Sequence, residues 1–556
     1  MALRFILGGL LGLLALPIGC ALEPARIDEA ALGYLKRADC AAREAEARTA
    51  VAPEPEIRPV GERGDLCLTL GEAIRRALAG NHEIQIASYD PAIAEEDVVR
   101  AEAAFDTVSF LSNTFGRTNR PIQSVLDTGL VGDDTLIEDT WQFQGGVRQL
   151  LPTGGTVALY EDLNYLDTNS TLTMPNPQYR AGLGVELAQP ILKGAGARIN
   201  RAAIRVANLN ADMSRGGFRW TVMDVLTRIT NAYWQLAYEI ESVRVSRDTV
   251  DMAREVLRRE KVRVESGISK DMDVARARAA LAEREGELVR AENRVRLTMD
   301  RLKLLLNSAD APLDADCRLL PADPLRAEPT QPDRGEAVAL ALANRPDIEN
   351  ARTAVAINRI RLDVADRERL PKLDAVLRYT MNGLGENLGR SMGDQHAFSQ
   401  SDWTAGLEFE VPLGNRDAQA SHRKRLFEYE QSLVQADRVV AQSIQEVNLA
   451  VRTIETATRE VEVTHEAVLA SDQTRKGEQI RFELGERTNE ELLRAQDRLA
   501  AAERAHLMAL LGHNLARIEL ARAQGTLLEA MGIEVVGPEE GEEGRPGPVR
   551  ARMQAD

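Results

Sequence analysis

One stretch of the chain occurs twice, and this duplication constrains the architecture more than any single residue does. Residues 71–84 read GEAIRRALAGNHEI, and residues 335–348 read GEAVALALANRPDI, 264 positions later. A second pair follows at 263–285 (RVESGISKDMDVARARAALAERE) and 481–503 (RFELGERTNEELLRAQDRLAAAE), 218 positions apart. Repetition over such long segments predicts two similar structural halves within one chain.

The composition favours long helices and argues against a nucleic-acid-binding protein. The chain has 556 residues, enough for two to four ordinary domains; 28% are charged and only 4% are aromatic. This bias is typical of long helices rather than of a mixed globular core. The formal net charge is −17, and we find no concentrated basic face of the kind that binds nucleic acid.

The first 21 residues predict export from the cytoplasm. Arg4 precedes an apolar run over residues 5–16, which is too short for a comfortable membrane span and is typical of a secretory signal. Cleavage after Ala21 is one processing route. Lipidation of Cys20 is the other, because residues 16–20 (LPIGC) imperfectly match a lipoprotein box.

The remaining cysteines and the histidines give no metal-binding pattern. Cys40 and Cys67 flank a polar, proline-containing stretch, and an exported chain permits a disulfide between them. Two separate thiols are the alternative, and Cys317 adds a third. His506 and His513 share a predicted helix face, but no further ligand cluster accompanies them. We therefore expect neither a metal nor a cofactor.

Each half is predicted to run helix, strands, very long helix, tight turn and long helix. In the first half (67–310) the helical pattern stops over 105–192, where Gly, Thr, Asn and Ser increase and apolar residues alternate with polar ones. In the second half (335–530) the strand region is 371–412, and residues 402–411 alternate most regularly. A polar loop is expected over about 383–401.

Apolar residues recur every three or four positions over 220–243, and nothing breaks the helical pattern before Gly267. The helix that this predicts is about 100 Å long. Gly267 and Gly485 form the turns of the two long hairpins. The segments outside the halves are a signal peptide (1–21), an N-terminal extension (22–66), a linker (311–334) and a tail (531–556) predicted to be disordered.

The two halves differ in length at one place. Gln189-Pro190 corresponds to Val411-Pro412 at an offset of 222, although the halves begin at an offset of 264. The first half therefore carries 42 extra residues between Phe105 and Gln189. These residues lie in the strand region, where loops tolerate changes in length.

The strand regions suggest a sheet with one wet face. Four or so strands cannot close a barrel, and open sheet edges are not viable in a bilayer, so a membrane sheet would need several protomers. A soluble coiled-coil protein with a small β-sandwich is the alternative. Trp141, Tyr379 and Trp403 would be interfacial aromatics in the first case and ordinary sheet packing in the second.

In order and spacing, these features resemble the TolC-like outer-membrane efflux and secretion channels over about 68–530. The resemblance rests on LTLGEA at 68–73, GEA at 335–337, QPILKGAG at 189–196 and the paired glycine turns. It implies a mainly α fold with a membrane β-barrel part. Three chains would form a homotrimer with four or more strands each, in the family a 12-stranded barrel, and the helices would continue it as a periplasmic tunnel.

The resemblance also implies partners and a site at the helical tips. The tips would dock a periplasmic adaptor (membrane fusion) protein, and an inner-membrane transporter would supply the energy. Family tunnels narrow at the tips and often carry acidic rings. The candidate gate and adaptor-contact residues are Gly267, Asp271, Asp273, Gly485, Glu490, Glu491 and Arg494.

Two observations complicate a simple acidic gate. Asp273 and Glu491 match between the halves, but Arg494 stands where some relatives carry an acidic residue. Nearby basic residues, including Arg263 and Arg487, also permit solvated ion pairs.

The leading hypothesis is a passive export channel in the outer membrane of a Gram-negative-type bacterium, with its helical part in the periplasm. It would serve a tripartite efflux pump or a type I secretion system. A periplasmic adaptor is the first alternative, although an adaptor should have one coiled-coil hairpin and this chain has two. A structural scaffold is the second. No Ser/His/Asp arrangement suggests an enzyme, and KGAG at 193–196 lacks the GK[ST] ending of a phosphate loop.

Overall fold

The computed structural model describes residues 65–122, 129, 135–267, 269–308, 310–313, 317–328, 330–397, 399–484, 486–537 and 549–553. These residues belong to one unit, Gly64–Asp556; the other unit, Met1–Arg63, lies outside the described part. The predicted signal peptide, Cys20, Cys40 and Gly485 therefore lie outside the described residues.

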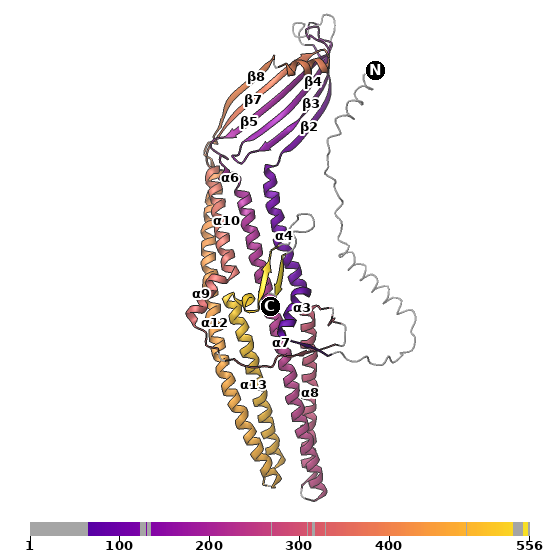
Figure 1. The fold of residues 1–556 in the computed structure, drawn as a ribbon, viewed down its shortest axis with the longest axis vertical. Helices are drawn as coiled ribbons and strands as arrows, with labels where there is room; N and C mark the ends of the chain where they lie inside the picture. The colour runs from indigo at the N-terminus through magenta and orange to yellow at the C-terminus, as the bar shows by residue number, and fades with distance from the viewer. Residues whose placement is uncertain are drawn as a thin grey trace, which may run out of the picture. The chain divides into compact units, whose positions relative to one another are not determined.

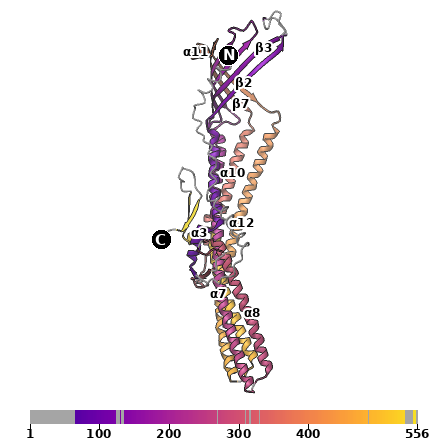
Figure 2. The ribbon, with the colours of Figure 1, turned by 90° about the vertical axis from the view of Figure 1, so that its right-hand side faces the viewer.

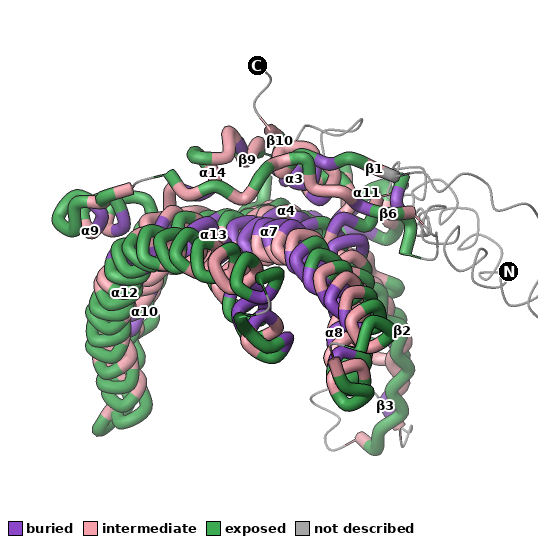
Figure 3. Tube along the Cα trace, turned by 90° about the horizontal axis from the view of Figure 1, so that it is seen from below, coloured by how far each residue is buried: buried purple, intermediate pink, exposed green. Residues whose placement is uncertain are grey.

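Long helices run between a sheet at one end of the unit and two helical tips at the other (Figure 1). Next to the sheet, neighbouring helices follow the order α4, α7, α10, α12. Toward the tips the order is α8, α7, α13, α12, and these helices form an arch in Figure 3. The helices are α3 (Leu70–Gly80), α4 (His82–Glu102), α6 (Ala197–Asn200), α7 (Ala202–Glu265), α8 (Asp271–Leu306), α9 (Arg334–Asn344), α10 (Pro346–Glu368), α11 (Leu388–His396), α12 (Arg416–Glu483), α13 (Asn489–Gln524) and α14 (Leu527–Ala530), with a 3₁₀ turn η1 (Ala103–Phe105).

We call the four helices next to the sheet the upper tier and the four toward the tips the lower tier. Helices α7 and α12 belong to both tiers, because they are 64 and 68 residues long. At 1.5 Å per residue each extends about 100 Å, as the sequence predicts. Among the described helices, none combines the length and the apolar character needed to cross a membrane.

The predicted internal repeat is confirmed element by element. Both ends of α9 match those of α3 at an offset of 264, and both ends of α13 match those of α8 at an offset of 218. One difference from the prediction is a break at the start of each half, where a single helix was expected. Asn81 separates α3 from α4 by capping the second helix with its side chain, and Arg345 occupies the equivalent position between α9 and α10.

Six antiparallel strands form the main sheet, in the order β2-β3-β4-β5-β7-β8. The expectation of four or more strands is confirmed, but the family total of twelve assumes four strands per chain and does not apply to six. Strand β7 corresponds to β2 at an offset of 264, and β8 corresponds to β5 at about 222. The 42 extra residues therefore contain the hairpin β3–β4. The strands are β2 (Val108–Pro121), β3 (Thr135–Leu150), β4 (Thr156–Thr168), β5 (Gln178–Pro190), β7 (Lys372–Gly385) and β8 (Ser401–Glu410).

One face of this sheet is apolar across all six strands. Direct partners in the ladder share a face, so the register assigns each side chain to one side. Trp141, Tyr379 and Trp403 all belong to this apolar face. Its other large members are Leu111, Phe115, Phe143, Val147, Val157, Leu159, Leu163, Tyr165, Tyr179, Leu183, Val185, Leu187, Leu373, Leu377, Met381, Leu407 and Phe409.

A short helix covers one polar residue of the apolar face. The loop predicted over 383–401 is wrong for Leu388–His396, which form α11 beside the sheet (Figure 2). The Nε2 of Gln395, whose residue is 1% exposed, donates to Glu161 Oε1 at 2.8 Å. Glycine at 383 allows this packing, because a Cβ there would lie 1.9 Å from the Ser391 carbonyl oxygen.

Two small sheets lie outside the main one. In the predicted linker, β6 (Arg318–Pro321) pairs in parallel with β1 (Asp65–Leu68). Tyr233 of α7 anchors this sheet by donating to Asp323 Oδ2 at 2.7 Å, and burial raises the pKa of its hydroxyl. The prediction of a disordered tail is wrong for β9 (Ile533–Val536) and β10 (Arg550–Met553), which pair with each other and add Ile533 and Ala551 to the core.

Candidate functional site

The first tip connects α7 to α8 through Gly267, whose φ of +73° favours glycine. Asp273 stabilises the start of α8, because its Oδ2 accepts from the Lys270 backbone N–H at 3.4 Å and from Ser269 Oγ at 3.2 Å. Ser269 Oγ also lies 2.7 Å from Oε2 of the buried Glu260. Asp271 is exposed and has no partner among the described residues.

The second tip connects α12 to α13, and its acidic residues are also paired. Thr488 and Glu491 form a capping box at the start of α13, in which the Thr488 backbone N–H donates to Glu491 Oε2 at 3.1 Å. Arg487 Nη1 lies 2.6 Å from Glu491 Oε1. The Thr488 backbone bond, followed by the charge of Arg487, lowers the pKa of the Glu491 carboxyl. Glu490 pairs with Arg494 at 2.5 Å.

The two tips pack against each other. Val256, Ala277, Phe482 and Leu492 form a small buried cluster drawn from both hairpins. Next to this cluster, Asn489 Nδ2 lies 3.4 Å from the carbonyl oxygen of Asp273. The sequence-predicted residues at the starts of α8 and α13 are therefore brought together. Gly485 lies outside the described residues.

Ion pairs that join the two hairpins were not predicted from the sequence, and two of them lie near the tips. Arg259 of α7 lies 3.0 Å from Glu483 of α12. Arg284 of α8 is only 5% exposed, and its Nη2 lies 2.6 Å from Asp497 of α13. Arginine is common on the exposed faces of this chain, so the sequence alone does not show that position 284 is buried.

These contacts define the chemistry available at the tips. Glu490 and Glu491 are ion-paired within the chain, and Asp273 accepts hydrogen bonds at the start of α8. Of the four candidate carboxylates, Asp271 has no side-chain partner among the described residues. Within the described residues, no group of three or more His, Cys, Asp or Glu side chains could hold a metal. Among the described tip residues, the carboxylates cap helices and form ion pairs within the chain.

His506 and His513 do not form a ligand pair. The ring of His506 lies 5.3 Å from that of His465 on α12, whereas His513 is fully buried and its ring nitrogens have no hydrogen-bond partner among the described residues. Burial lowers the pKa of both imidazoles. Cys67 is an exposed thiol of β1, and its pairing with Cys40 stays a prediction, since Cys40 lies outside the described residues.

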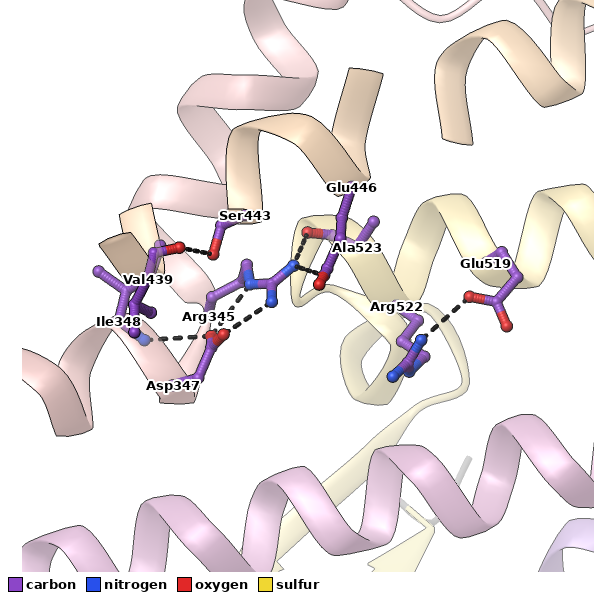
Figure 4. Close-up of polar contacts among 9 residues, drawn as sticks. All are labelled: Arg345, Asp347, Ile348, Val439, Ser443, Glu446, Glu519, Arg522 and Ala523. Carbon is purple, nitrogen blue, oxygen red and sulfur yellow. Dashed lines mark hydrogen bonds and ion pairs between the residues drawn. The ribbon is translucent and has the colours of Figure 1, made fainter. Parts of the chain in front are cut away.

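A buried arginine, Arg345, lies between α9 and α10 and contacts several helices of the second half (Figure 4). Arg345 is 3% exposed, and its guanidinium lies 2.7 Å from both Asp347 and Glu446. It also donates to the Ala523 carbonyl oxygen at 3.3 Å. Trp220 of α7 lies beside this guanidinium, with 5.3 Å from the ring centroid to Arg345 Cζ. The junction therefore joins α7, α10, α12 and α13, which position the tips.

Duplicated long hairpins capped by an antiparallel sheet with one apolar face define a class of membrane channel protein. Comparison with known families agrees. The family described as outer membrane efflux protein matches residues 157–308 and 337–526, more than half of the chain. The chain therefore belongs to the outer membrane efflux protein family.

Solved structures share the fold at low sequence identity. The CmeC outer membrane channel of Campylobacter jejuni is 14% identical with a TM-score of 0.61, over 86% of this chain and 94% of CmeC. VceC of Vibrio cholerae is 16% identical with a TM-score of 0.60, over 82% and 96%. The MtrE outer membrane channel of Neisseria gonorrhoeae, solved in an open state, is 16% identical with a TM-score of 0.56, over 86% and 96%. No curated protein matches the chain.

The family and the fold together establish an outer-membrane efflux channel whose helical part lies in the periplasm. The family is one of channels rather than of enzymes. Neither the family match nor the structural neighbours support the adaptor or scaffold alternatives.

Proposed function

We propose that the channel works as a homotrimer and forms the outer-membrane component of a tripartite efflux pump or a type I secretion system. A periplasmic adaptor and an inner-membrane transporter are its partners. The observation that carries the proposal is the open sheet. Strands β2 and β8 are unpaired edges in the single chain, and all of β8 and nearly all of β2 is exposed. Open edges are not viable in a bilayer, so further copies must cover them.

The outer helices of the upper tier also support assembly. In the order α4, α7, α10, α12, the first and last helices have a neighbour on one side only. Exposed apolar side chains lie on both of them, including Ile86 and Ile93 on α4 and Phe427 and Val434 on α12, each more than 60% exposed. Contact with neighbouring copies would bury this surface.

The helical tips are the proposed gate and adaptor contact. They lie at the end opposite to the sheet (Figure 1), where a periplasmic partner would meet the channel. Charged side chains are exposed at both tips. The proposed contact residues are Gly267, Asp271, Asp273, Gly485, Glu490, Glu491 and Arg494.

A site-specific cross-link tests the adaptor contact. A photoreactive phenylalanine analogue replaces Met272 in the first tip, where the native side chain is 60% exposed. We expect a covalent adduct with a periplasmic adaptor, identified by mass spectrometry. Leu172, which is 62% exposed between β4 and β5 at the sheet end, is the matched control and should give no such adduct. An adaptor adduct at 172 and none at 272 would contradict the proposed orientation.

A further inference from the structure

We infer that three copies of this chain close an 18-stranded barrel, in which β8 of each copy pairs with β2 of the next in one defined register. The inference rests on the proposed homotrimer and adds to it the number of strands, the edge that each copy presents and the residues that meet there. Six strands per chain give this total.

The internal repeat supplies the pairing rule. Both ends of β7 match those of β2 at an offset of 264, and β8 lies within the segment that matches β5 at an offset of 222. Within one chain, β5 pairs with β7 in an antiparallel ladder. The junction between the two halves of one chain is therefore the counterpart of the junction between the second half of one chain and the first half of the next. By this equivalence, β8 pairs with β2 of the neighbouring copy.

The same offsets predict the register. Val185 lies opposite Tyr379 in the β5–β7 ladder, and this pair translates to Leu407 opposite Phe115 of the next copy. The translated pair is apolar, and both of its members belong to the apolar face. The register therefore continues this face across the junction between copies without interruption, as a one-residue slip would not.

The same register places one pair of opposite charges at the junction. Arg180 opposite Leu384 translates to Asp402 opposite Arg120 of the next copy. Strand β2 contains Arg117 and Arg120 but no acidic residue, and β8 contains three acidic residues but no basic one. Cross-strand pairs of opposite charge stabilise a ladder. The two edges are therefore complementary to each other rather than to themselves.

The width of the sheet fits the helices beneath it. Six strands spaced about 4.8 Å apart and tilted as in a barrel span roughly 37 Å. The four helices of the upper tier, at about 8–10 Å each, span roughly 32–40 Å. Four strands at the same tilt would span only about 25 Å. The β3–β4 hairpin thus lets the sheet cover the full width of its own four helices.

The strand number also sets the width of the barrel. Barrel diameter grows roughly in proportion to strand number, so 18 strands give about 1.5 times the diameter of 12. Because each sheet is about as wide as the four helices beneath it, the barrel and the neighbouring helical section have about the same width.

Cysteine cross-linking tests the junction directly. Phe115→Cys and Leu407→Cys are introduced together into a chain whose Cys40, Cys67 and Cys317 are replaced by Ser. Positions 115 and 407 lie on opposite edges of the sheet of one chain, so a disulfide between them forms only between copies. After oxidation of outer membranes, a non-reducing gel should show bands of two and three chains. Phe115→Cys with Glu408→Cys is the control, because these side chains point to opposite faces and should give only the single-chain band.

Light scattering of the same preparations separates this inference from the homotrimer. A mass of three chains without the 115–407 cross-link would overturn the inferred junction and leave the homotrimer intact. A mass of one chain would overturn both.

Excision of the extra hairpin tests the strand number. Removal of residues 135–176 deletes 42 residues, an even number that keeps the remaining strands on their faces. In projection along the threefold axis, the sheet end of the full chain should be about 1.5 times as wide as that of the excised variant. Equal widths for two trimeric preparations would show that β3 and β4 do not belong to the barrel wall.

Discussion

Asn81 and Arg345 occupy equivalent positions in the two halves, and each donates a hydrogen bond to a carbonyl oxygen of the last long helix in its half. Asn81 Nδ2 lies 2.8 Å from the Leu305 oxygen, and Arg345 Nη1 lies 3.3 Å from the Ala523 oxygen. Leu305 and Ala523 are themselves equivalent, at the offset of 218 that relates the two hairpins. The same contact is thus made by a neutral amide in one half and by a guanidinium in the other.

Replacement of Arg345 by Ala should strongly destabilise the second half. The change leaves the carboxylates of Asp347 and Glu446 without their shared cation and removes a donor from the Ala523 oxygen. Because Asp347 and Glu446 are themselves partly exposed to water, the cost is that of the lost charge-assisted hydrogen bonds, about 1.5–3 kcal/mol. The measurement is guanidinium unfolding of the purified protein. Arg352→Ala on the exposed side of α10 is the control and should change the free energy of unfolding by less than about 0.5 kcal/mol. Equal effects of the two substitutions would refute the role of Arg345.

Charge at the tips should be separable from helix capping. Asp273→Asn and Glu491→Gln remove the charges but retain oxygen acceptors for the caps, whereas Ala substitutions also remove the caps, at about 1 kcal/mol each. If the carboxylates select ions, the Asn/Gln double variant should lower cation preference, measured as a smaller reversal potential across a salt gradient. Glu462→Gln, an exposed position on α12, should leave it unchanged. An unaltered reversal potential in the double variant would show that these carboxylates do not select ions, and would contradict the proposed role of the tips as a gate.

The turn at Gly267 should reject a side chain. With φ at +73°, Gly267→Ala is strained by about 1–2 kcal/mol and should increase protease cleavage at the first tip. Gly286→Ala is the control and should change the stability in the opposite direction. Position 286 is helical, and a Cβ there would only contact Arg290 at 3.6 Å. It should stabilise α8 by about 0.5–1 kcal/mol. Equal cleavage of the two variants would contradict the turn geometry.

Acid should loosen the hairpin near Glu255. Hydrogen bonds from Arg258 and then Arg259 lower the pKa of this carboxyl from 4.5 to about 2. Because the pKa is depressed in the folded state, its contribution is present above pH 4.5 and is lost as the pH falls toward 2. Amide hydrogen exchange in α7 around residue 255 should therefore accelerate over this interval. In Glu255→Gln the acceleration of exchange at low pH should be smaller than in the wild type. An unchanged pH dependence of exchange in this variant would show that protonation of Glu255 does not cause the effect.

Much of the fold follows from sequence patterns, because duplication and the helical period act over many residues. The long helices, the capping box of Thr488 with Glu491 and the position of the 42 extra residues were all predictable. The helix break at Asn81 was not, because that helix pattern continues through it. Capping by the Asn81 side chain becomes visible only when the chain direction is known.

The strand count was harder to predict, for a reason that is visible in β3. Acidic residues 138 and 139 and glycines 145 and 146 interrupt its alternation, and its neighbours β2 and β4 supply the missing regularity. Long-range pairing also explains the failure at β9 and β10, which lie in a polar tail and are ordered through each other. At the tips, the sequence indicated the charged residues but not the cross-hairpin pairing of Arg284 with Asp497.

Conductance of the purified full-length protein in a planar lipid bilayer tests the export-channel function most directly. If the protein is a passive conduit, the current should rise in discrete steps of uniform size. The purified particles should have the mass of three chains. A preparation that is folded and trimeric but adds no current above that of lipid alone, with or without replacement of the tip carboxylates, would contradict the assignment.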